Sequence, residues 1–155
     1  MMNKHKQYVE KAKKEFQTID HLIYMTYPLV KDKKLLIAIT MGLFEVVKSC
    51  MGALLEKERL ERNIMTLPIN FNSRFFLFRE KCAEKYGIKD DMLKLISELN
   101  KLIEEQNENS NRFMGEEELV ICNEGYTNLK TLDINLLKDY ATKIRKFLEV
   151  VKQID

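Results

Sequence analysis

The sequence predicts an all-α fold, a bundle of about five helices with a small β-hairpin between the last two. Glycine (5) and proline (2) are scarce among the 155 residues, so few positions interrupt a helix. Apolar residues recur three and four positions apart along most of the chain, which is the spacing of one helical face. A chain of this length buries a sizeable core, and we expect a single domain over residues 1–155.

The first helix is expected over residues 4–25. Pro28 has no N–H and disfavours helical backbone at the residue before it, so this helix should end or kink near Tyr27. Lysines occupy much of its polar surface, and its apolar stripe consists of Val9, Ala12, Phe16, Ile19 and Ile23.

The second helix should begin after Asp32, a favourable N-cap, and run to about Arg62. Its first two-thirds are apolar nearly all round, as in a central helix that packs on several sides. Small residues four positions apart would permit the close approach of a neighbouring helix; they are Ala38 and Gly42, then Ser49 and Ala53. The last third, EKERLERN, is highly charged, and we expect it to project beyond the core.

The apolar segment from Leu35 to Leu55 is long enough to span a bilayer. Glu45 and Lys48 fall near its centre, and each would cost roughly 2.5–3.5 kcal/mol in a membrane. We therefore expect a buried helix of a soluble protein, without membrane insertion.

Two further helices precede the predicted hairpin. One should run from residue 73 to residue 86 and stop at Gly87; the next should start at Asp90 or Asp91 and end in the polar loop QNENSN. The inward residues would be Phe71, Phe75, Phe78, Cys82 and Tyr86 around the first of these helices, and Met92, Leu95, Ile96, Leu99, Leu102 and Ile103 on the second.

The hairpin is predicted over about residues 118–132, where LVIC and YTNLKTL flank the turn-forming Asn123-Glu124-Gly125. Because an isolated two-stranded hairpin is only marginally stable, it should lie on the helices. Asp133 then caps a last helix. Its inward residues would be Leu137, Tyr140, Ile144, Phe147, Val151 and Ile154.

The sequence carries no motif for cofactor or metal chemistry. Its five glycines are scattered, so no phosphate-binding loop or dinucleotide fingerprint is present. Neither His5 nor His21 follows a glutamate by three residues, and neither HExxH nor a CxxC pair occurs. The cysteines, Cys50, Cys82 and Cys122, are odd in number and far apart, which favours reduced thiols of a cytoplasmic protein. We therefore predict no catalytic residue, no metal and no cofactor.

One cluster of polar side chains lies before the predicted break at Pro28. Asp20, His21, Tyr24 and Tyr27 are spaced three and four apart, so they share part of one helical face. A carboxylate, an imidazole and two phenols could bind a polar ligand or a partner. They could equally form a hydrogen-bonded lock that fixes the angle between the first two helices.

A basic patch would form if two lysine- and arginine-rich segments met in space. These are Lys31, Lys33 and Lys34 at the first corner, and Arg74 and Arg79 on the third helix. Such a patch would suit nucleic acid. The sequence pI is only 8.3, and a solvated charged surface is the other explanation.

The sequence resembles small all-α bundles of the HEPN type in size, in its amphipathic first helix, and in its long central helix with a polar end. RNA-cleaving members carry an arginine, a polar residue and, a few residues later, a histidine near the end of that helix. Arg62 and Asn63 stand in the matching place, but Leu67 or Pro68 stands where the histidine would be. Without an imidazole to perform acid–base chemistry, the resemblance implies RNA binding and no cleavage.

The stretches TYPLVKDKKLL, MGALL and LVICNEGY are also similar to a group of archaeal helical proteins, a resemblance that implies no activity. We expect a cytoplasmic, non-enzymatic binding or scaffolding module that self-associates as a homodimer or binds another protein. The charged end of the second helix and an exposed hairpin edge are the expected contact surfaces. The alternative is a catalytically inactive HEPN-like protein that binds RNA.

Overall fold

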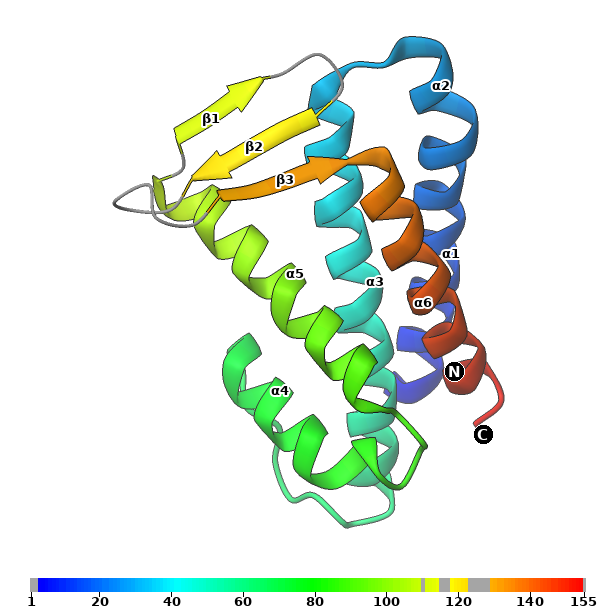
Figure 1. Cartoon of the computed structure of the whole chain (residues 1–155). Coiled ribbons are helices and arrows are strands. Elements are labelled where there is room, and N and C mark those ends of the chain that lie inside the picture. The colour runs from blue at the N-terminus through cyan, green and yellow to red at the C-terminus, as the bar shows by residue number, and fades with distance from the viewer. Residues whose placement is uncertain (1–2, 110, 115–117, 123–128, 155) are drawn as a thin grey trace.

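The computed structural model describes residues 3–109, 111–114, 118–122 and 129–154, and it confirms the all-α fold class (Figure 1). The first helical body consists of α1 (Lys4–His21), the π-helix η1 (Leu22–Thr26) and α2 (Tyr27–Val30). The second is α3 (Lys33–Leu60), and the third consists of α4 (Phe71–Phe78) and the π-helix η2 (Arg79–Ala83). They are followed by α5 (Asp90–Asn109) and α6 (Ile134–Lys152).

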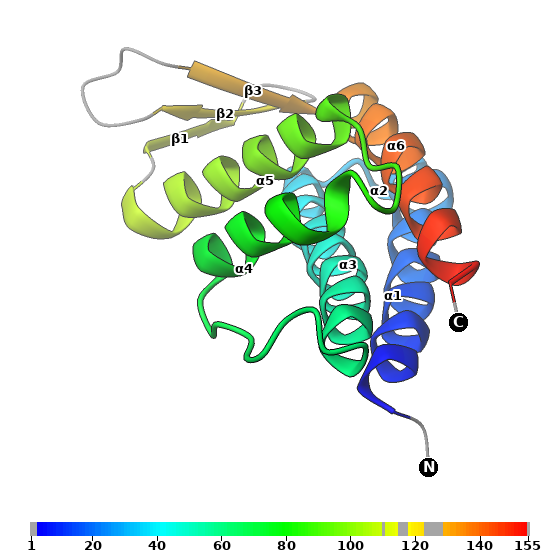
Figure 2. The ribbon, with the colours of Figure 1, turned by 90° about the horizontal axis from the view of Figure 1, so that it is seen from below.

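The long helix α3 forms the centre of the bundle and contacts α1, α4, α5 and α6 (Figures 1 and 2). Asp32 caps it, as predicted, by accepting a hydrogen bond from the Lys34 N–H at 2.9 Å. Its side chains are buried nearly all round; those with no exposed surface include Leu36, Ile39, Leu43, Val46, Val47, Cys50, Leu54 and Leu55. Among the described helices, α3 alone is long and apolar enough to cross a membrane, a criterion that the core helix of a soluble protein also meets.

Small residues bring α1 and α3 together. A Cβ atom on Gly42 would collide with the Ile19 side chain, and one on Gly52 would lie 2.7 Å from the Tyr8 ring. The prediction of a close approach is thus confirmed at Gly42, and Gly52 adds a second such point. Ala38, in contrast, is exposed.

Of the two alternatives predicted near Tyr27, an end of the helix is wrong, whereas the α-helix is indeed interrupted there. The helix widens into the π-turn η1 just before the proline, where the Tyr27 N–H donates to the Leu22 carbonyl oxygen, five residues back. It then continues as α2 and ends at Lys31, which adopts a left-handed backbone with φ 50°. The irregular turn accommodates a proline that lacks an N–H and crowds the preceding turn.

Three antiparallel strands, in the order β1-β2-β3, cover one end of the bundle (Figure 1). They are β1 (Asn111–Met114), β2 (Glu118–Cys122) and β3 (Leu129–Asp133). The predicted hairpin corresponds to β2 and β3, with Leu119 opposite Leu132, whereas its predicted turn at 123–125 lies outside the described residues. β1 was not predicted, and α5 continues to Asn109 through most of the predicted loop QNENSN. β2 packs on α3 and α5, and β3 packs on α6.

The remaining boundaries follow local signals in the sequence. Gly87, with φ 73°, stops the third helical body, and Asp133 caps α6 by accepting from the Leu136 N–H at 2.8 Å. Most of the predicted inward residues of these helices are buried, among them Phe75, Phe78, Cys82, Leu95, Ile96, Leu99, Ile144, Phe147 and Val151. Phe71, Tyr86, Ile103 and Ile154 are half-buried.

Candidate binding surfaces

Of the four polar residues before Pro28, Asp20 and Tyr24 contact α6. Asp20 forms an ion pair with Arg145 at 2.9 Å, and the Lys138 ammonium lies 5.4 Å from the centre of the Tyr24 ring. His21 is exposed and Tyr27 is buried in the core. The four side chains therefore have different surroundings, and those of Asp20 in α1 and Tyr24 in η1 contact α6.

Four large side chains stand exposed within the same short segment. Tyr24, Met25, Leu29 and Val30 are 44%, 59%, 86% and 59% exposed, respectively. We call these four residues the apolar corner. Sequence periodicity missed it, because the π-turn and α2 rotate Met25, Leu29 and Val30 away from the core, and apolar residues are otherwise expected inside.

The two basic segments do not meet. Lys31, Lys33 and Lys34 lie at the start of α3, whereas Arg74 lines a cavity together with Ser49. From Lys34 to Ser49 the helix rises about 22 Å. Arg79 is farther along the third helical body and lies over the Phe75 ring, 4.8 Å from its centre. A single patch of these five residues is therefore not formed.

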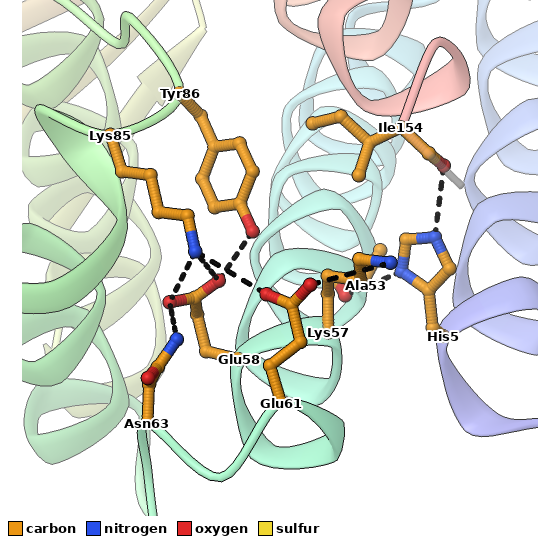
Figure 3. A network of polar contacts seen from close by, with 9 residues as sticks. All are labelled: His5, Ala53, Lys57, Glu58, Glu61, Asn63, Lys85, Tyr86 and Ile154. Atoms are coloured by element: carbon orange, nitrogen blue, oxygen red, sulfur yellow. Dashed lines mark hydrogen bonds and ion pairs between the residues drawn. The ribbon is translucent and has the colours of Figure 1, made fainter.

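The prediction that the charged end of α3 projects beyond the core is wrong for Glu56 and Glu58, which are buried, whereas residues 60–63 are exposed as predicted. Glu58 is only 2% exposed and Glu56 only 4%. Glu58 accepts hydrogen bonds from Lys85 (2.8 Å), Tyr86 (2.5 Å) and Asn63 (3.0 Å), and Figure 3 shows these groups converging on its carboxylate.

These contacts set the protonation of the network. Burial alone would raise the pKa of Glu58, but the hydrogen bonds from Lys85, Tyr86 and Asn63 outweigh burial and hold it below the usual value. Burial and the Glu58 charge raise the pKa of the Tyr86 hydroxyl. Glu58 is thus an ionised carboxylate whose oxygens are occupied by donors, and it joins the end of α3 to the end of the third helical body.

The two residues that match the HEPN motif have different roles. Asn63 belongs to the Glu58 network through both its side chain and its N–H, which donates to the Glu58 carbonyl oxygen at 2.9 Å. Arg62 is exposed and has a left-handed backbone with φ 65°. Both residues are exposed, but Asn63 is held against the end of α3 by its bonds to Glu58.

A buried histidine joins the two ends of the chain to α3. His5 Nδ1 lies 2.7 Å from the Ala53 carbonyl oxygen, and its Nε2 lies 3.1 Å from that of Ile154 (Figure 3). The ring is 2% exposed. His5 was not singled out by the sequence, because its partners are backbone atoms of distant residues.

A groove runs between α1, α3 and the segment that leads into α4. It consists of two adjoining cavities of about 480 and 330 Å³ that share Tyr8, Lys11, Ile69 and Arg74. Lys4 lines one end and Lys48 the other. We call it the cationic groove, after Lys4, Lys11, Lys48 and Arg74.

The groove has basic residues on α1, and along the segment that leads into α4 and the start of α4 it has Arg74 beside apolar residues. Among the described residues, its two carboxylates already have partners: Glu45 pairs with Lys48 at 2.8 Å, and Glu56 with Arg59 at 2.7 Å. The apolar residues are Leu67, Ile69 and Phe71, and Ile69 is 98% exposed. The sequence hinted at only one wall, since Lys4, Tyr8 and Lys11 are spaced four and three apart on one face of α1.

The described cysteines are packing residues. Cys50 and Cys82 are both free and buried. Burial, and then the nearby Glu15, raise the pKa of Cys50, and burial raises that of Cys82 to about 12. Both thiols are therefore protonated at neutral pH and poor nucleophiles. Among the described residues, no three His, Cys, Asp or Glu side chains are grouped as a metal site would require.

No protein-family model matches this sequence, and no curated protein matches it significantly.

Proposed function

We propose that this chain is a cytoplasmic binding or scaffolding module, without a catalytic role, that self-associates through the apolar corner. The observation that carries the proposal is the exposure of Tyr24, Met25, Leu29 and Val30, four large side chains within seven consecutive residues. Exposed apolar residues are common when scattered, but a contiguous group marks a contact surface.

The energetics favour covering this corner. Burying a fully exposed leucine or valine side chain contributes about 1.5–3 kcal/mol. Leu29 and Val30 are neighbours in the sequence, and both are more than half exposed. The polar residues Lys31 and Asp32 follow directly and would form the hydrated rim of an interface. A two-fold contact between identical corners is the simplest arrangement, because one patch then serves both copies.

The test compares two exposed apolar residues. Leu29 in the corner and Met65 in the segment before α4 are both 86% exposed. We expect gel filtration with light scattering to give a dimer for the wild type and for Met65→Lys, at low and high salt, and a monomer for Leu29→Lys. A wild-type monomer at all concentrations, or equal effects of the two substitutions, would contradict the proposal.

A second function, RNA binding by a catalytically inactive HEPN-like protein, is supported by the lysines that follow the corner. Lys31 and Lys34 are exposed at the α2–α3 junction. Phosphate contacts by such residues make binding strongly dependent on salt. If this function holds, the same experiment with added RNA will show a complex at low salt that Lys31→Glu and Lys34→Glu weaken. RNA binding that leaves the protein monomeric would favour this function over the first.

The cytoplasmic location has its own support. Free, buried thiols such as Cys50 and Cys82 are typical of a reducing compartment.

A further inference from the structure

We propose that the cationic groove binds an extended, acidic and apolar peptide segment of a partner protein. This site is separate from the apolar corner. Between Tyr8 in the groove and Leu29 in the corner the first helical body rises about 30 Å, so either proposal can fail without the other.

Arg74 is the anchor for a carboxylate. Its Nη1 donates to the Pro68 carbonyl oxygen at 3.2 Å, which holds the guanidinium at the groove. Arg74 forms no ion pair with any residue that the structure describes, although it lines both cavities. A guanidinium has five N–H donors in a fixed geometry that matches a carboxylate.

Further cations continue along the groove. Lys4 also lacks an ion pair within the described part of the chain, and Lys11 has only a long contact of 4.0 Å with Glu15. Because these lysines and Arg74 line the same space, a ligand with more than one negative charge would be held at several points.

The segment that leads into α4, beside Arg74, adds apolar groups opposite the lysines of α1. Ile69 is almost fully exposed, and Leu67 and Phe71 are half-buried beside it. This pairing of cations with aliphatic side chains complements a peptide that presents carboxylates on one side and apolar side chains on the other. Alternate side chains of an extended strand point in opposite directions, which meets that requirement.

Two observations favour a peptide over single-stranded RNA. The exposed Ile69 and its neighbours Leu67 and Phe71 offer apolar surface, which a charged phosphate backbone does not complement. Bases also need exposed aromatic faces on which to stack, whereas the Tyr8 ring packs directly over Gly52.

The experiment titrates the full-length protein into short fluorescein-labelled probes and follows fluorescence anisotropy. The probes are a peptide that alternates glutamate and leucine, a peptide that alternates glutamate and serine, and an oligouridine of similar length. We expect the glutamate–leucine peptide to bind most tightly, and Arg74→Glu to weaken it about tenfold or more, because a charge-assisted bidentate contact is replaced by repulsion.

The matched control is Arg79→Glu, which makes the same charge change on the same helical body outside the groove. It should leave the affinity within about twofold of the wild type, as should Leu29→Lys in the apolar corner, because distant sites act independently. Circular dichroism establishes that each variant is folded. The proposal is overturned if no peptide binds, if the two arginine variants weaken binding equally, or if the oligouridine binds more tightly than the peptides.

Discussion

Glu58 is the residue at which charge and burial conflict most strongly. A carboxylate that is 2% exposed is stable only if its oxygens are hydrogen-bonded, and the three donors come from two places in the sequence: Asn63, and the adjacent Lys85 and Tyr86. The composition of EKERLERN suggested a solvated tail. The spacing carried the correct signal, since Glu58 follows Cys50 and Leu54 at intervals of four on the buried face of α3.

Removing this carboxylate should destabilise the fold. We expect Glu58→Ala to lower the free energy of unfolding in urea by about 2–3 kcal/mol, because it removes the hydrogen bonds of a buried carboxylate and leaves its space unfilled. Glu61 provides the control, since it is exposed and contacts the same Lys85 at 3.3 Å. Glu61→Ala should change stability by at most about 0.5 kcal/mol. Equal losses in the two variants would show that burial of Glu58 is not what matters.

The Glu58 network also predicts a dependence on pH. Its pKa is lower in the folded chain than in the unfolded chain, so its contribution is fully present above the unfolded pKa and is lost as pH falls through the folded pKa. We expect the difference in urea midpoint between the wild type and Glu58→Gln to be largest near pH 7 and to close below about pH 4. A difference that stays constant down to pH 3 would rule out this linkage.

Among the helices and strands, boundaries were predicted better than contacts. Asp32, Gly87 and Asp133 act through their own backbone neighbours, so the sequence alone locates them. The π-turn before Pro28 and the strand β1 were not predicted. The π-turn lets the helix continue past a proline that would otherwise interrupt it. The strand β1 is a short segment that gains its ladder hydrogen bonds by pairing with β2.

A substitution of His5 tests whether its hydrogen bonds stabilise the contact between the two ends of the chain and α3. Its ring nitrogens lie 2.7 Å from the carbonyl oxygen of Ala53 in α3 and 3.1 Å from that of Ile154 after α6, and a carbonyl oxygen accepts, so the ring is the donor. We expect His5→Ala to lower the free energy of unfolding by about 1–3 kcal/mol. His21→Ala is the matched control, because His21 is exposed on the same helix and should change stability by at most about 0.5 kcal/mol. The comparison would count against this role for His5 if both variants unfolded at the same urea concentration.

For the whole molecule, the fold class and most of the core could be predicted from the sequence, because helical periodicity is a local property. The two candidate binding surfaces could not be predicted. The cationic groove requires α1, α3 and Arg74 to be placed side by side, and the apolar corner requires Met25, Leu29 and Val30 to point outward. Both depend on tertiary packing, whereas the predicted basic patch joined segments that the bundle keeps apart.

Self-association through the apolar corner is tested by amide hydrogen exchange at low and high protein concentration. We expect exchange to slow at high concentration over residues 22–35, while residues 64–70, beyond the other end of α3, are unaffected. Rates that are independent of concentration everywhere, or slowing confined to another part of the bundle, would contradict it.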